Sequence, residues 1–301
     1  MALHLYLAQD RLRALARQQM LPAQAQGAAL FADISGFTVL TEALALRHGE
    51  RRGVEVLSQA VGGVYDALIT EVERFGGSTL SFAGDAITCW FDAAGDAEHA
   101  APAAARAVQA ALAMQRGLQA AADVAAAAST ADAASSQTAP LALKVSVASG
   151  PAHRLAIGDA SIQTLDVLAG STVTRVAMAD ALAQAGDVLL DEATAAAVQA
   201  PVLARRTHAT GLVFALLDPT WRGPLQHAPP RPSPLVQPPP AEVLRPWVLP
   251  FVFERETAGQ GLFDTDLRPV VALFLRFGAK KARPVHKTGD KPGEDLPRRP
   301  S

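Results

Sequence analysis

Two stretches of the chain constrain its fold more than any other part. Residues 28–41 read AALFADISGFTVLT, which predicts an apolar strand over 28–32, then Asp33, a Ser-Gly turn and a helix from Thr38. Residues 76–91 read GGSTLSFAGDAITCWF, which predicts a hairpin with Gly84-Asp85 at its turn. Gly-Asp between two strand-like runs is typical of a two-residue hairpin connection. Each stretch therefore carries one aspartate at the end of a strand.

These two aspartates are candidate metal ligands. If their strands are neighbours, the carboxylates of Asp33 and Asp85 lie at the same edge of one sheet. Carboxylate and carbonyl oxygens are the ligands that Mg²⁺ prefers, and it keeps positions for substrate phosphates. Two such ions can clamp the attacking and leaving oxygens of a phosphoryl transfer. The alternative is that Asp33 is a turn or helix-cap residue and Asp85 an ordinary hairpin-turn aspartate.

The two stretches also match a pair of known motifs in the right order and spacing. The pattern F-x-D-I-x-G-F-T is complete, and G-G-x-x-x-K-x-x-G-D is present except for its lysine, with these residues: Phe31, Asp33, Ile34, Gly36, Phe37, Thr38; Gly76, Gly77, Ser81, Gly84, Asp85. In these residues the chain resembles the catalytic domain of class III adenylyl and guanylyl cyclases. It is most similar to the first cyclase domain of the soluble, bicarbonate-type adenylyl cyclases, over residues 27–217.

The resemblance implies a function for several of these residues. Asp33 and Asp85 would bind two Mg²⁺ or Mn²⁺ ions with help from the Ile34 carbonyl. Nucleotide contacts would come from Gly36, Phe37, Thr38 and Gly84. The reaction would convert ATP to cyclic AMP and pyrophosphate in intracellular signalling. Class III sites form between two cyclase domains, so the partner would be a second such domain, in a homodimer or a heterodimer.

The other half of the expected site departs from the family pattern. The base-selecting lysine falls at Ser81, and the transition-state asparagine and arginine fall at Thr174 and Met178. Asp166 lies near a second base-contacting position, and Arg175 is either a substitute for the missing groups or a solvated helix residue. Two functions stay open. The chain either supplies the metal-binding half of a dimeric site, or is a catalytically incomplete regulatory or nucleotide-binding domain that needs a partner.

The order of predicted elements, β-α-α-β-β-α-β-β-α-β-α-β, indicates an α+β fold with a ferredoxin-like βαβ-type sheet and helices on its face. Within it we expect a strand over 141–148 that Gly150-Pro151 ends, a strand pair around Gly158-Asp159, and a helix over 171–185. The expected domains are an N-terminal helix (1–26), the cyclase-like domain (27–217), a Pro-rich extended linker (218–250), a truncated second cyclase domain (251–278) and a disordered tail (279–301). An unrelated C-terminal tail is the alternative for the last two.

Composition bears on possible binding partners, membrane spans and cellular location. The formal net charge of −2 gives no electrostatic argument for binding nucleic acid. No run of about 18 uncharged apolar residues occurs, so no membrane span is predicted. The amphipathic residues 3–20 indicate a short helix packed on the domain, or alternatively a helix for a membrane surface or partner. The single cysteine, Cys89, is expected in the core, which fits a reducing, cytoplasmic location.

Overall fold

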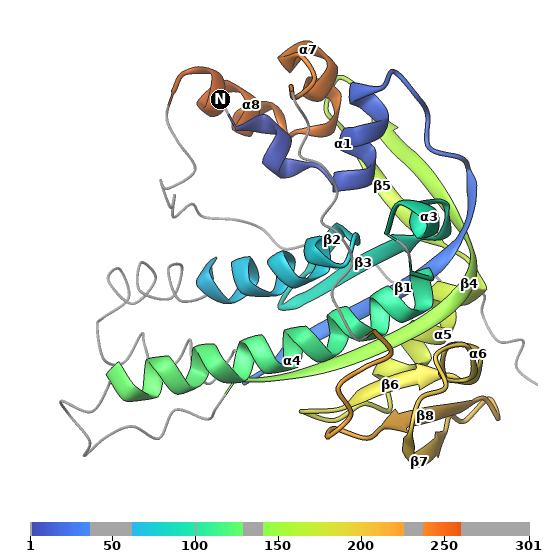
Figure 1. The fold of residues 1–301 in the computed structure, drawn as a ribbon. Helices are drawn as coiled ribbons and strands as arrows, with labels where there is room; N and C mark the ends of the chain where they lie inside the picture. The colour runs from blue at the N-terminus through green and yellow to red at the C-terminus, as the bar shows by residue number, and fades with distance from the viewer. Residues whose placement is uncertain (1, 37–61, 100, 129–140, 226–236, 260–301) are drawn as a thin grey trace, which may run out of the picture. The chain divides into compact units, whose positions relative to one another are not determined.

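The computed structural model describes residues 2–36, 62–99, 101–128, 141–225 and 237–259. All of them lie in one unit of the chain, Met1–Thr265, and a second unit, Asp266–Ser301, lies outside the described residues. Figure 1 shows a long, twisted sheet with the helix α4 running along it. No helix in the described ranges combines the length and the apolar character needed to cross a bilayer.

The described residues form eight strands in one sheet and a series of helices around it. The strands are β1 (Gln24–Ser35), β2 (Ser78–Ala83), β3 (Ala86–Asp92), β4 (Ala142–Asp159), β5 (Gln163–Ala169), β6 (Val188–Asp191), β7 (Val202–Thr207) and β8 (Val213–Leu217). The helices are η1 (Leu3–Tyr6), α1 (Gln9–Ala16), η2 (Ala93–Gly95), α3 (Asp96–His99), α4 (Ala103–Ala128), α5 (Ser171–Asp180), α6 (Glu192–Ala197), α7 (Ala241–Leu244), η4 (Arg245–Trp247) and α8 (Pro250–Thr257). Residues 62–74 are also helical.

Strand β1 lies between β3 and β4 in the sheet. The order is β2-β3-β1-β4-β6-β8-β7, with β5 paired to β4, and β1 is antiparallel to both of its neighbours. The predicted hairpin is confirmed, because β2 and β3 pair across the Gly84-Asp85 turn. The α+β class expected from the sequence is also confirmed. The strand that ends in Asp33 is thus next to the hairpin that carries Asp85.

The two faces of β1 pack against different helices. Residues 28, 30, 32 and 34 belong to the larger core cluster, together with α4 and the helical residues 62–74. Ala29 and Phe31 face the other way, in a cluster that includes Val176 of α5. Side chains of a strand alternate between faces, so Asp33 lies on the face that α5 covers. In β4 the same alternation buries Leu143, Val145 and Val147 against α4 and places Lys144 on the α5 face.

The predicted end of a strand at Gly150-Pro151 is wrong. Strand β4 continues through this dipeptide to Asp159, because it has strand partners along the whole way. Gly27 and Gln26 of β1 pair with Gly150 and Pro151, and β5 pairs with β4 from His153 onward. The predicted strand pair around Gly158-Asp159 is therefore the far end of β4 with its partner β5. The helix expected over 171–185 ends earlier, at Asp180.

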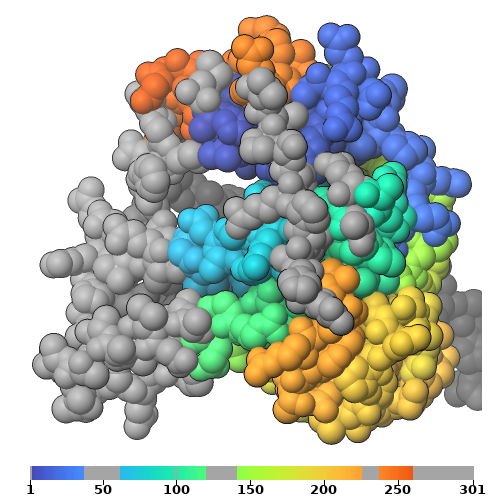
Figure 2. All heavy atoms as spheres, viewed as in Figure 1, coloured from blue at the N-terminus to red at the C-terminus, as the bar shows by residue number. Residues whose placement is uncertain are grey.

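The first and last described segments form one packed unit, which we call the terminal cap (residues 2–16 and 241–257). Its apolar cluster joins Leu3, Leu7 and Leu12 to Leu244 and Val248. Figure 1 and Figure 2 show the blue and orange segments side by side. The prediction of an extended linker as far as residue 250 is thus wrong for residues 241–247, because their apolar side chains have a surface to bury against. The proposed boundaries of a second domain stay a prediction, since residues 260–301 lie outside the described part.

Candidate metal centre

Asp33 and Asp85 lie at the same end of the paired strands β1 and β3. Asp33 is the register partner of Ala86, the residue that follows Asp85. The backbone N–H of Ile34 donates to the carbonyl oxygen of Asp85 at 3.4 Å, which joins the end of β1 to the hairpin turn. The Asp33 side chain is 23% exposed, so a solute can reach it. Two residues that are 52 positions apart in the sequence (85 − 33) thus lie close together in the fold.

Tyr65, from the helical residues 62–74, is a neighbour of this site that the sequence did not reveal. Its hydroxyl donates to the carbonyl oxygen of Gly84 at 3.3 Å, and its ring packs edge-on against Phe82. Burial and then the negative charges of Asp85 and Asp33 raise the pKa of Tyr65. Both carboxylates are therefore close enough to act on one hydroxyl group.

Lys144 is the other residue of the site that sequence reasoning missed. Its Nζ lies 2.9 Å from Asp33 Oδ2 and 3.2 Å from Asp180 Oδ1. Burial by itself would lower the pKa of Lys144, but hydrogen bonds to both aspartates, together with their charges, exceed this effect and raise it. The alternating pattern of residues 141–148 indicated that Lys144 points away from the core, but only the register of β1 and β4 places it opposite Asp33.

The donor atoms at this edge fit Mg²⁺ or Mn²⁺. Asp33 and Asp85 supply carboxylate oxygens, and within the described residues no group of three or more His, Cys, Asp or Glu side chains could hold a metal ion. A two-carboxylate site suits a cation that keeps water and substrate phosphates as its other ligands. Gly36 and Gly84 stand next to the carboxylates with φ of 93° and 64°, values that favour glycine. The predicted nucleotide contacts Phe37 and Thr38 lie outside the described residues.

Of the residues at the family's other functional positions, Ser81 is exposed, and Thr174 and Met178 make contacts within the fold. Ser81 is exposed on β2, next to a register shift in its pairing with β3. Thr174 donates its hydroxyl to the carbonyl oxygen of Gly170 one helical turn earlier. Met178 packs on an apolar cluster with Leu189 and Phe214. The side chain of Met178 fills space in the fold and offers no hydrogen-bond donor to a phosphate.

The two charged candidates on this side are also engaged. Arg175 donates to Asp191 Oδ2 at 2.7 Å and to the carbonyl oxygen of Ser149 at 2.8 Å, so it is neither a solvated residue nor a free guanidinium. Asp166 accepts two hydrogen bonds from Arg11 Nε, at 3.1 and 3.2 Å, and one from Nη2 at 2.6 Å. Only 7% of the Asp166 side chain is exposed. The terminal cap therefore covers the carboxylate that the resemblance placed near the base.

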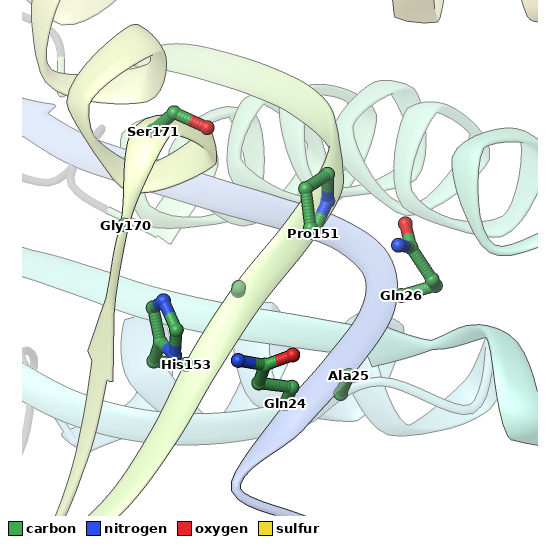
Figure 3. Close-up of a pocket in the computed structure, with 8 residues that line it drawn as sticks. Gln24, Ala25, Gln26, Pro151, His153, Gly170 and Ser171 are labelled. Atoms are coloured by element: carbon green, nitrogen blue, oxygen red, sulfur yellow. The ribbon is translucent and has the colours of Figure 1, made fainter.

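A separate hollow of about 380 Å³ lies at the opposite end of β1. Figure 3 shows the side chains of Gln24, His153 and Ser171 around it, where β1, β4 and the start of α5 come together. None of the predicted metal or nucleotide residues lines this hollow. The strand β1 runs from Gln24 beside the hollow to Asp33 nine residues later, so the two places are distinct.

Comparisons of the sequence give one local match. No protein-family model matches the chain. Adenylate cyclase type 10 from Rattus norvegicus is 41% identical over 61 residues, and the human protein of the same name has the same identity over the same length. The matched segment is 20% of this chain and only 4% of the length of these curated relatives.

Comparisons of the structure cover most of the domain. The structure of a bacterial light-regulated adenylyl cyclase aligns with a TM-score of 0.54 at 17% identity, over 72% of this chain and 59% of that one. The guanylyl cyclase Cya2 aligns with a TM-score of 0.52 at 19% identity, over 66% of this chain and 94% of that one. The adenylyl cyclase CyaB from P. aeruginosa aligns with a TM-score of 0.51 at 17% identity, over 65% of this chain and 95% of that one.

The fold is therefore that of the class III adenylyl and guanylyl cyclase domains, which confirms the class expected from the two motifs. Over 61 residues the sequence is also similar to adenylate cyclase type 10, in agreement with the resemblance to the soluble cyclases.

Proposed function

We propose that this chain supplies the metal-binding half of a dimeric adenylyl cyclase site, which converts ATP to cyclic AMP and pyrophosphate. The observation that carries the proposal is that Asp33 and Asp85 lie at the same end of the paired strands β1 and β3. The N–H of Ile34, next to Asp33, donates to the carbonyl oxygen of Asp85 in the hairpin turn. The local similarity to adenylate cyclase type 10 supports ATP as the substrate, whereas adenylyl and guanylyl cyclases share the fold.

The proposal gives each predicted metal or phosphate ligand a role. Asp33 and Asp85, with the carbonyl of Ile34, hold Mg²⁺ or Mn²⁺. When bound, the metal ions lower the pKa of the ribose 3′-hydroxyl and neutralise charge that develops on the phosphates. The backbone of Gly36, Phe37 and Thr38 would meet the triphosphate, because the sequence predicts a helix from Thr38 and free N–H groups at the start of a helix favour anions.

The second half of the site comes from a partner. Ser81, Thr174 and Met178 of this chain do not offer the base-selecting lysine, the asparagine or the arginine of the family. A homodimer would lack these groups at both of its sites, whereas a heterodimer with a complete cyclase domain would have one working site. We therefore propose a cytoplasmic signalling heterodimer in which this chain is the metal-binding member.

A second function is favoured by a specific set of contacts. Asp166, Arg175 and Met178 are all engaged in ion pairs or packing, so none of these three residues is a ready substitute for the missing groups. A catalytically incomplete regulatory domain, which binds metal and nucleotide or only a partner, has this arrangement.

The experiment is an assay of cyclic AMP formation and of Mn²⁺–ATP binding by the purified chain, with Asp33→Asn beside it. We expect the chain alone to bind Mn²⁺–ATP without turnover, and we expect Asp33→Asn to weaken this binding on the order of 10-fold or more. Asp159→Asn is the matched control, because it removes an exposed carboxylate at a distant turn and leaves an oxygen for the bond from Ser161.

Three outcomes separate the functions. Binding that depends on Asp33, without product, supports a half-site, and cyclic AMP formation after a complete cyclase domain is added distinguishes it from a regulatory domain that binds metal and nucleotide. Cyclic AMP formation that Asp33→Asn abolishes would mean that the chain completes its own site, and the assignment of Thr174 and Met178 as disabling would be wrong. Neither product nor metal-dependent binding would leave the regulatory domain.

A further inference from the structure

One ammonium group is shared by two carboxylates beside the candidate metal centre. Lys144 Nζ lies 2.9 Å from Asp33 Oδ2, and 3.2 and 3.3 Å from the two carboxylate oxygens of Asp180. Asp33 and Lys144 are direct neighbours across β1 and β4, and Asp180 is the last residue of α5 on the same face of the sheet. The three side chains are 20–23% exposed, so water screens their charges only in part.

The position of Asp180 is unfavourable without Lys144. The carbonyl groups at the C-terminal end of a helix carry partial negative charge, which destabilises a carboxylate there. Asp33 adds a second negative charge on the far side of Lys144, with Asp85 next to it at the hairpin turn. The group of Asp33, Lys144 and Asp180 thus holds one positive and two negative charges. The two carboxylates share one ammonium group, so its charge does not neutralise both of them.

We propose that Asp180 is a positioning residue for the metal centre: it takes over Lys144 when Asp33 binds a divalent cation. The inference rests on the proposed function, because it requires a metal at Asp33. A divalent ion at Asp33 repels the ammonium group, and the flexible stem of lysine lets that group move. Both oxygens of Asp180 already lie within 3.3 Å, so the ammonium keeps a partner throughout the exchange.

The consequence concerns metal affinity. With Asp180 present, a metal ion displaces Lys144 from Asp33 at small cost, since one ion pair replaces another. Without Asp180, the ion must break the remaining ion pair of a partly buried lysine and leave its charge without a partner, which is unfavourable. Asp180 therefore increases the affinity of Asp33 for metal although it is not itself a ligand.

The test is a double-mutant cycle read by direct Mn²⁺ binding. Electron paramagnetic resonance would measure free Mn²⁺ against the full chain, alone and with 3′-deoxy-ATP, which lacks the attacking hydroxyl. We expect Asp180→Asn to weaken Mn²⁺ binding about fivefold to tenfold in the wild-type chain, and to change it less than about twofold beside Lys144→Met. Asp180→Glu should restore affinity, and Asp159→Asn should leave it unchanged.

The remaining outcomes each have a meaning. Equal weakening by Asp180→Asn in both backgrounds would overturn the proposal, because Asp180 would then act through its own charge. No effect of Asp180→Asn would overturn it as well. If the wild-type chain binds no Mn²⁺ in either condition, the metal half of the proposed function fails and this inference falls with it. Thermal unfolding of each variant excludes a general loss of the fold as the cause of weaker binding.

Discussion

At the scale of single residues, the strongest structural constraint is a buried arginine. Arg106 of α4 is 0% exposed and donates to the carbonyl oxygens of Ala101, Phe75, Gly76 and Asp92 and to the carboxylate of Asp96. It thus ties α4 to the end of the helical residues 62–74 and to the end of β3. The acceptors at Ala101 and Phe75 are in buried hydrogen bonds, so they would lose their partner if the guanidinium were removed.

We predict that Arg106→Met lowers the free energy of unfolding by about 3–5 kcal/mol, because it leaves several buried acceptors unpaired. Chemical denaturation followed by tryptophan fluorescence measures this change. The control is Arg116→Met, on an exposed position of the same helix, for which we expect a change within about 0.5 kcal/mol. Equal effects of the two substitutions would contradict the role given to Arg106.

Cys89 offers a second prediction at this scale. It is fully buried, and burial raises the pKa of its thiol to about 12. Thiol reagents attack the thiolate, so a native chain at pH 8 should react with a disulfide reagent far more slowly than the chain in denaturant. A rate in the native state that equals the rate in denaturant would mean that β3 opens readily.

The residues of the candidate site were predictable only where a sequence motif carries them. Asp33 and Asp85 follow from the two motifs, and the register of β1 and β3 brings them together. Lys144 and Tyr65 could not be found in this way, since each is brought to the site by pairing or packing between distant segments. Arg175 was misjudged for the same reason, because its partner Asp191 lies 16 positions further along the chain.

At the scale of elements, local patterns were reliable and long-range ones were not. The alternation of residues 141–148 and the Gly-Asp turn predicted β4 and the β2–β3 hairpin correctly, because each depends on nearby residues. The continuation of β4 through Gly150-Pro151 depends on β1 and β5 as partners, which no local pattern contains. The helix α7 was missed because its apolar side chain Leu244 is buried in a cluster that includes the distant N-terminal residues Leu3, Leu7 and Leu12.

The docking of α1 on the β4–β5 pair gives a prediction for this element. Arg11 is bonded to Asp166, its guanidinium stacks 4.5 Å from the Trp247 ring centroid, and its neighbour Asp10 is ion-paired with the buried Arg154. Removing Arg11 leaves a buried carboxylate with a poorer partner. We predict that Arg11→Ala lowers the free energy of unfolding by about 3 kcal/mol.

The matched control for this prediction is Arg17→Ala, because Arg17 follows the same helix and is exposed. Its effect should stay within about 0.5 kcal/mol. Urea denaturation of both variants gives the comparison, and a loss for Arg11→Ala no greater than that for Arg17→Ala would show that the ion pair with Asp166 contributes little to the docking.

At the scale of the whole molecule, the terminal cap joins the two ends of the described chain. Leu12, only 2% exposed, packs with Leu244 and Val248, and Glu256 accepts from the N–H of Ala2. The helices α7 and α8 are short, and isolated helices of this length are unstable in water. Their order must therefore come from packing on the N-terminal residues.

Local stability in the cap should then be shared between its two segments. We predict that Leu12→Ala speeds hydrogen–deuterium exchange in residues 250–257 and leaves exchange in β6 and β8 unchanged, because a cavity in the cap weakens only what packs there. Leu203→Ala is the control, since Leu203 is 63% exposed and should alter neither region. If exchange in residues 250–257 of Leu12→Ala stays at the wild-type rate, α8 is stable without the N-terminal segment. If exchange also becomes faster in β6 and β8, the terminal cap and the sheet unfold as one unit.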